Sequence, residues 1–384
     1  MFSRRTGWDL AANSIADRIE RRRAAGRLVD LTETNPTRCG LEWPAAELAA
    51  ALTAPALSRY DPTPRGSEAA RAAVVRYLAD RGASATVEQV VLTASTSEAY
   101  GLVLKLLCDP GDEILAPTPS YPLLDLLAGV EGVRLVRYPL HHAGEWHLDR
   151  AALAAAVTER TRAVLAVSPG NPTGAALTQG DLEFLDLLCA ERGIALVGDE
   201  VFADSAPTPG PSVAAARRAL AFHLSGASKV CGVPQLKAAW IAVVGPPALA
   251  DAALERLDVL ADTALSISGP AQLALPYLLD HRESFLARLR ERLATNRAEL
   301  ARAVAGGAPL SVLSGRGGWS DVLKVGTSMD EEALVSRLLD DGVAVHPGFF
   351  YDFERPGHLV VSLLVEPGAF AEGVRLVAAR LHAM

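Results

Sequence analysis

Lysine is scarce in this chain. Only four of its 37 basic residues are lysine, and the other 33 are arginine. Because arginine does not lose its proton in a protein whereas lysine can, each lysine is a candidate for a place where an amine is required. Two of the four, Lys229 and Lys237, lie within nine residues of each other.

Cysteine is equally rare. The four cysteines, Cys39, Cys108, Cys189 and Cys231, form no C-x-x-C motif, so we expect buried thiols in a reducing cytosol and no metal site. No uncharged apolar run approaches the ~18 residues of a membrane helix. The basic N-terminus is not followed by an apolar stretch, which argues against a secretion signal. The prediction is a cytoplasmic protein without a membrane span.

No basic block stands out either. The net charge is −8, whereas nucleic-acid binding favours a clustered positive surface, so no nucleic-acid partner is expected. Glycine (31) and proline (24) are too few for a collagen or low-complexity chain. Half of the 384 residues are apolar, enough for a large core and for two to three domains at ~150 residues each.

Short apolar runs alternate with helical patterns between residues 90 and 245. Runs that are apolar on both faces and separated by helices favour a mostly parallel sheet with helices on both sides, an α/β fold. The expected strands are 90–92, 113–116, 133–138, 163–167, 194–197, 221–224 and 236–244, and the expected helices are 99–107, 123–128 and 181–192.

The C-terminal part has a different pattern. A long amphipathic helix over 283–304 precedes strands at 319–325, 343–346 and 359–364 and a helix at 330–339, which is an α+β arrangement. We therefore predict a large domain over 46–275 and a smaller α+β domain built from both termini, 1–45 and 276–384.

Polar segments follow four of the expected strands, where parallel sheets bind ligands. The first, T-A-S-T-S-E at 93–98, places hydroxyls at the first turn of a helix; it suits an anion, or serves only to cap that helix. The second, S-P-G-N-P-T-G at 168–174, fixes the amide of Asn171 in a constrained loop, or is a plain loop.

The other two segments carry charge. Asp199 closes an apolar strand, where a carboxylate is costly to bury without a positive partner; capping of the next helix is the alternative. Lys229 ends the segment S-G-A-S-K at 225–229. Together the four segments offer an anion site, an amide, an acid and an amine. Pyridoxal 5′-phosphate fits this set, because it needs a phosphate site, a carboxylate at its ring nitrogen and a lysine.

These motifs resemble the class I/II aminotransferases, pyridoxal-phosphate enzymes of fold type I. The resemblance runs from N-P-T at 35–37 to the strand near Ser362 and includes S-P-G-N-P-T-G, D-E, S-G-x-S-K and G-x-P-x-x-K in order. The spacings are 28 residues from Asn171 to Asp199 and 30 from Asp199 to Lys229, a specific pattern. The resemblance implies a transaminase acting on an amino acid and a 2-oxo acid.

The resemblance also implies roles for individual residues. Lys229 would form the Schiff base and later move a proton, and Asp199 would pair with the ring nitrogen. The expected cofactor contacts are Asn171 to the phenolic oxygen, Ser95, Thr96, Ser97 and Ser228 to the phosphate, Tyr121 stacked on the ring, and Tyr60 reaching the phosphate of a neighbouring subunit in a homodimer. Asn35 and Trp319 would line the substrate pocket.

Three positions depart from the family's pattern. Phe202 stands where a tyrosine usually bonds the phenolic oxygen, and Lys237 stands where an arginine usually contacts the phosphate. Val360 takes the place of the arginine that holds the substrate's α-carboxylate. Arg316 is our preferred replacement, with Arg38, Arg65 and Arg355 as the other candidates.

The missing arginine keeps other functions open. A second hypothesis is another reaction with the same cofactor, either elimination across a C–S bond or the oxidation or cyclisation of a specialised amino acid. A third is a non-catalytic sensor that binds the cofactor, against which the absence of a helix-turn-helix extension or basic arm argues.

Overall fold

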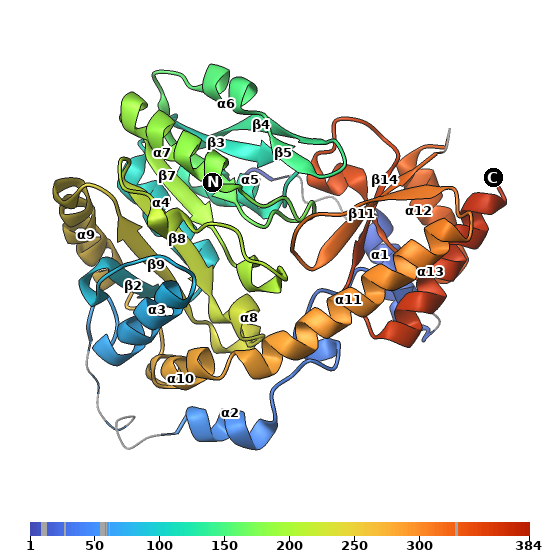
Figure 1. Cartoon of the computed structure of the whole chain (residues 1–384), viewed down its shortest axis with the longest axis horizontal. Helices are drawn as coiled ribbons and strands as arrows, with labels where there is room; N and C mark the ends of the chain where they lie inside the picture. The colour runs from blue at the N-terminus through green and yellow to red at the C-terminus, as the bar shows by residue number, and fades with distance from the viewer. Residues whose placement is uncertain (9–13, 27, 54–57, 59, 61, 327–328) are drawn as a thin grey trace.

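The computed structural model describes residues 1–8, 14–26, 28–53, 58, 60, 62–326 and 329–384, and Figure 1 shows its course. The helices are α1 (Ser14–Ala24), α2 (Ala45–Ala51), α3 (Glu68–Asp80), α4 (Thr96–Leu107), α5 (Leu123–Glu131), α6 (Arg150–Ala156), α7 (Gln179–Arg192), α8 (Ala227–Val230), α9 (Pro247–Asp262), α10 (Gly269–Asp280), α11 (Glu283–Ala305), α12 (Glu331–Asp340) and α13 (Pro367–His382). Short 3-10 turns, among them η5 (Ala203–Ser205), η7 (Pro234–Leu236) and η8 (Gly348–Tyr351), connect several of them.

An eight-stranded sheet forms the larger half of the molecule. Its order is β2-β9-β8-β7-β6-β3-β4-β5, and neighbours from β8 to β4 are parallel, whereas β9 and β5 run antiparallel to the strands beside them. The strands are β2 (Val90–Thr93), β3 (Glu113–Thr118), β4 (Arg134–His142), β5 (Trp146–Leu148), β6 (Thr161–Val167), β7 (Ala195–Asp199), β8 (Ala221–Gly226) and β9 (Ala239–Val244).

Helices cover both faces of this sheet, which confirms the expected α/β architecture (Figure 1). Side chains alternate along each strand, so Leu165 and Val197 pack with α4, α5 and α9. Val164 and Leu196 face the other way and pack with α6 and α7. Burial on both sides explains why these strands are apolar throughout.

A smaller antiparallel sheet, β10-β11-β14-β13, forms the second half. Its strands are β10 (Leu310–Leu313), β11 (Ser320–Val325), β13 (His346–Pro347) and β14 (His358–Ser362), while β1 (Val29–Asp30) pairs in parallel with β12 (Val343–Ala344). The β1–β12 pair places the N-terminal segment beside the C-terminal elements. Helices α11 and α13 lie next to each other in this half (Figure 1).

The structure corrects two expected strands. The strand expected over 236–244 begins at Ala239, because Pro234 opens the turn η7 and Lys237 adopts a left-handed backbone (φ 55°). The strand expected over 343–346 is divided between β12, which pairs with β1, and β13, which pairs with β14. In the described part of the chain, no helix combines the length and apolar character that crossing a membrane requires.

Candidate active site

The carboxyl ends of six strands, β2, β3, β4, β6, β7 and β8, lie at one edge of the large sheet. Strand β2 has the same direction as β8, because both are antiparallel to β9, and β3, β6 and β7 are parallel to β8. Thr93, Ala239 and Gly226 lie in register across β2, β9 and β8. The sequence motifs therefore gather along this edge, and the ends of β2 and β8 are two strand spacings apart, about 10 Å.

Lys229 lies at the centre of this edge. Helix α8 starts directly after β8 and places Lys229 Nζ 4.8 Å from the ring centroid of Trp319 and 5.8 Å from that of Phe202. The two rings pack edge to face, with centroids 5.4 Å apart. Burial among these rings lowers the pKa of Lys229 from 10.5, since it disfavours the ammonium form, while the charge of Asp199 opposes that shift.

Asp199 ends β7, the strand next to β8. The Tyr100 hydroxyl donates to Asp199 Oδ2 at 2.8 Å, and the Val201 N–H donates to Oδ1 at 3.2 Å. Burial raises the pKa of Asp199 above 3.8, although both hydrogen bonds favour the ionised form. The turn η5 begins only after Phe202, so Asp199 does not cap a following helix.

The segment after β2 forms the N-terminus of α4. Ser95 caps this helix by accepting from the Glu98 N–H at 3.1 Å. Within the described chain, the N–H groups of Thr96 and Ser97 have no intramolecular acceptor. Two such N–H groups with neighbouring hydroxyls at a helix N-terminus suit a phosphate.

A turn of glycines from the smaller half packs against the Asn171 loop. The Arg316 N–H donates to the Gly174 carbonyl at 2.9 Å, and the Gly318 N–H donates to Ser205 Oγ at 2.7 Å. Gly174 and Gly315 approach so closely that a Cβ on either would meet backbone atoms. This contact places Trp319, which follows the turn, over Lys229.

Two side chains of the site lack a hydrogen-bond partner within the described chain. Among the described residues, neither the half-buried Asn171 side chain nor Lys229 Nζ has a hydrogen-bond partner. An amine beside a carboxylate, with a helix N-terminus on the same edge, matches the aldehyde, ring nitrogen and phosphate of pyridoxal phosphate. The donors present therefore fit this cofactor.

The remaining expected cofactor contacts lie at different depths. Ser228 precedes Lys229 in α8 and is half-buried, and Tyr121 follows β3 at the same edge with 47% of its surface exposed. The Tyr60 side chain is 83% exposed. Lys237 is exposed just before β9, beside the carboxyl end of β8.

Val360 belongs to an apolar cluster rather than to a charged site. It pairs with Val322 of β11 on one side and His346 of β13 on the other, so the three side chains share a face of the small sheet. Val360 is 2% exposed and packs with Trp146 and Tyr351. Next to Val360, the Tyr351 hydroxyl and His346 Nδ1 are 2.9 Å apart.

Most of the arginines considered as replacements already have carboxylate partners. Arg316 is half exposed and contacts Glu145 at 2.7 Å. Arg65 binds both oxygens of Asp258, and Arg38 lies 3.5 Å from Glu33. Among the described residues, Arg355 forms no ion pair with a carboxylate. Asn35, expected in the pocket, accepts from the Thr37 N–H and hydroxyl and so orders its own turn.

Tyr100 is the site residue that sequence reasoning missed. It lies on the buried face of α4 with Ala99 and Val103, so its position resembles that of a core residue. The available signal was its hydroxyl: a buried tyrosine usually needs a hydrogen-bond partner, and a strand-end acid on the neighbouring sheet is a natural one.

Comparison with known proteins identifies the relatives of this arrangement. The family model "Aminotransferase class I and II" matches residues 31–368. An alanine aminotransferase of Mycobacterium tuberculosis is 30% identical over 263 residues, 67% of this chain and 61% of that protein. The arginine–pyruvate transaminase AruH of Pseudomonas aeruginosa is 29% identical over 328 residues, 82% and 80% of the two chains.

Solved structures share the fold. The alanine aminotransferase of Pyrococcus furiosus superimposes with a TM-score of 0.90 over the full length of both chains, at 23% identity. An aspartate aminotransferase of Thermus thermophilus gives a TM-score of 0.87 over 99% of both chains, also at 23% identity. At these identities the likeness concerns the fold.

Proposed function

This chain belongs to the class I and II aminotransferase family, whose cofactor is pyridoxal 5′-phosphate, and we propose that it transfers an amino group from an amino acid donor to a 2-oxo acid. The observation that carries the proposal is the pair of Lys229 and Asp199, an amine of lowered pKa beside a buried carboxylate. Asp199 ends β7, and Lys229 lies in α8, which follows the neighbouring strand β8 at the ligand-binding edge of the sheet.

Asp199 would hold the cofactor at its ring nitrogen. When bound, pyridoxal phosphate supplies an electron-withdrawing ring that stabilises negative charge on the donor's α-carbon after a proton is removed. An ionised Asp199 keeps a proton on the ring nitrogen. Its two hydrogen bonds, from Tyr100 and the Val201 N–H, favour this ionised form in a buried environment.

Lys229 would hold the cofactor through its amine, and the same amine is our candidate for the base at the donor's α-carbon. Its lowered pKa increases the fraction of neutral amine near neutral pH, and only the neutral form accepts a proton. The rings of Trp319 and Phe202 lie within 6 Å of Nζ and shield it in part from water.

The other contacts fix the cofactor's orientation. We assign the phosphate to the N–H groups and hydroxyls at the start of α4, the phenolic oxygen to the Asn171 amide and the ring face to Tyr121. The phosphate residues are Ser95, Thr96, Ser97 and Ser228, with Lys237 as a nearby positive charge; Phe202 packs beside Lys229. Phe202 offers no hydroxyl, so Asn171 alone would bind the phenolic oxygen.

We also propose a cytoplasmic homodimer. Tyr60 is 83% exposed, and its hydroxyl is free to reach a neighbouring copy's phosphate. The β1–β12 pairing supports a small domain built from residues 1–45 and 276–384, beside a large domain over 46–275.

The donor's α-carboxylate needs a positive partner, because a buried unpaired charge is costly. We keep Arg316 for this role, with Asn35 and Trp319 lining the same pocket. The guanidinium shares a half-exposed ion pair with Glu145, and exposed pairs of this kind are weak enough to exchange for a substrate carboxylate. The name of the arginine–pyruvate transaminase reported above suggests pyruvate as the 2-oxo acid.

A second candidate is elimination or another reaction with the same cofactor. The apolar cluster around Val360 keeps it open, since Val360 stands at the position expected for the carboxylate-binding arginine and packs among apolar side chains. A donor whose side chain is apolar, or one without an α-carboxylate, would fit this face better.

A half-reaction separates the two candidates. The loaded protein is incubated with single amino acids and no acceptor, and the 2-oxo acid and the protein-bound amino group are quantified. The proposed function predicts one equivalent of 2-oxo acid per subunit and then no more until an acceptor is added. Continued product release with ammonia, without acceptor, would establish elimination instead. No product from any amino acid or amine would refute both.

A further inference from the structure

Tyr100 connects the two ends of the proposed cofactor site. Helix α4 begins at Thr96, and Tyr100 lies four residues later on the same side of the helix. The helix N-terminus is the proposed phosphate end, while the Tyr100 hydroxyl reaches Asp199 at the ring end. A single rigid element therefore bears on both ends.

Within the described chain, the Tyr100 hydroxyl is the one side-chain group that donates a hydrogen bond to Asp199. The second donor is the backbone N–H of Val201, on the other oxygen. His223, Glu200 and Lys229 act on Asp199 through their charges, not through hydrogen bonds to it. Each carboxylate oxygen has two acceptor sites, so Oδ2 can accept from Tyr100 and from a ring N–H at the same time.

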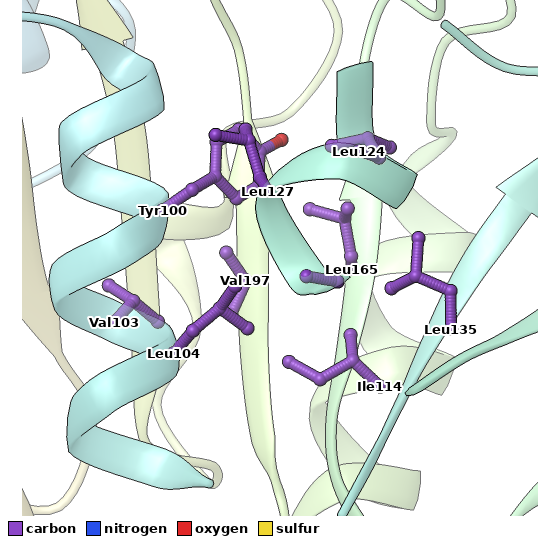
Figure 2. A pocket seen from close by; sticks show the side chains of 10 residues that line it. Tyr100, Val103, Leu104, Ile114, Leu124, Leu127, Leu135, Leu165 and Val197 are labelled. Atoms are coloured by element: carbon purple, nitrogen blue, oxygen red, sulfur yellow. The ribbon is translucent and has the colours of Figure 1, made fainter. Parts of the chain in front are cut away.

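Packing leaves Tyr100 little freedom to move. Its side chain is 7% exposed and lies at the wall of an apolar cavity of about 20 Å³ between α4, α5 and the sheet. Figure 2 shows Tyr100 projecting from α4 toward this wall, with Leu124 and Leu127 of α5 and Val197 of β7 around it. Burial raises the pKa of Tyr100 well above 10, so it stays a donor at any working pH.

We propose that Tyr100 is a positioning residue for the cofactor's ring nitrogen: its hydrogen bond orients the Asp199 carboxylate and keeps it ionised. This inference rests on the proposed function. Without the bond, Oδ2 loses its fixed donor, and the buried carboxylate becomes a poorer partner for a protonated ring. Tyr100 would act through Asp199 and touch no substrate.

Tyr100→Phe tests the inference, because it keeps the ring that packs against α5 and removes only the hydroxyl. The matched control is Tyr77→Phe. The Tyr77 hydroxyl donates to Asp204 Oδ2, also at 2.8 Å, and Tyr77 is 1% exposed. Both variants therefore lose a buried tyrosine–aspartate bond, but only one of these bonds ends on Asp199.

The primary readout is the ¹⁵N NMR shift of the ring nitrogen in protein loaded with ¹⁵N-pyridoxal phosphate, which reports ring protonation without turnover. We expect Tyr100→Phe to move this resonance toward the unprotonated position. Hydrogen bonds to charged groups contribute enough that kcat should fall on the order of tenfold or more, with KM within about twofold. Tyr77→Phe should leave the resonance and kcat unchanged.

The outcomes separate this inference from the proposed function. If the ring nitrogen is protonated in the wild-type protein and its ¹⁵N chemical shift is the same in Tyr100→Phe, the role of Tyr100 is overturned and the proposed function stays intact. Equal displacement by Tyr77→Phe overturns it as well, because the effect would then be general. No bound resonance in the wild-type protein refutes the cofactor site and this inference together.

Discussion

The substitution Gly317→Ala should push the glycine turn that carries Trp319 away from the Asn171 loop. Gly317 lies in the glycine turn that places Trp319 over Lys229. A Cβ at this position would lie 2.6 Å from Pro169 Cγ in the Asn171 loop and 3.2 Å from Ala206 Cβ on another side. A proline ring cannot rotate away, so the backbone of the turn must move.

The size of the effect follows from these distances. Ordinary contact starts at 3.4 Å, so the turn and the loop must part by about 0.8 Å. Overpacking of this kind costs about 1–3 kcal/mol. Displacements near 1 Å in a catalytic arrangement cost on the order of a hundredfold in rate, so we expect kcat/KM of Gly317→Ala to fall between tenfold and a hundredfold.

Steady-state kinetics and thermal unfolding of the loaded protein measure this effect. Gly129→Ala is the control. Gly129 lies in α5, and nothing beyond its chain neighbours and the backbone of its own helix comes within 4 Å of a Cβ at this position. Alanine also favours a helix over glycine by up to about 1 kcal/mol. We expect this control to keep full activity and to melt no lower than wild type. A Gly317→Ala protein with activity within threefold of wild type would refute the reasoning.

Other predictions concern the charged groups. Asp199→Ala should bind some cofactor but lose more than nine-tenths of turnover; a smaller loss, a barrier change under ~1.4 kcal/mol, would contradict its role at the ring nitrogen. Arg316→Ala should raise KM for the amino donor tenfold or more at unchanged cofactor affinity. Glu145→Gln frees Arg316 from its ion pair and should lower this KM. An unchanged KM in both variants would exclude Arg316 as the carboxylate partner. The pKa of Lys229 is lowered in the folded protein, so its charge destabilises the fold below that pKa, and this penalty disappears as pH rises toward 10.5. Cofactor-free Lys229→Met should therefore melt above wild type at pH 7, by a margin that shrinks toward pH 10; a constant margin would contradict the pKa shift.

Strand-end motifs made the family and the fold predictable. Apolar runs fixed the parallel strands, and Asn171, Asp199 and Lys229 follow three of them, so a parallel sheet brings them to one edge. The match over residues 31–368 confirms the family resemblance. The roles of the individual residues stay predictions.

Long-range contacts were not predictable from local patterns. The partner of Arg316 is Glu145, 171 residues away, and neither residue has a signal that names the other. Tyr100 has the spacing of a core residue, and only the neighbouring sheet shows that its hydroxyl meets Asp199. The division of 343–346 between two sheets likewise depends on distant strands: β1 pairs with the first part of this segment, and β14 pairs with the last part.

Borohydride reduction of the loaded protein, followed by peptide mapping, tests the central claim most directly. Reduction makes the bond between the cofactor and its lysine permanent, so the modified residue can be read by mass. Lys229 and Lys237 are close in sequence, but one is buried beside Asp199 and the other is exposed. We expect the label on Lys229 alone; a label on Lys237, or no label, would contradict the assignment of Lys229 as the cofactor's lysine.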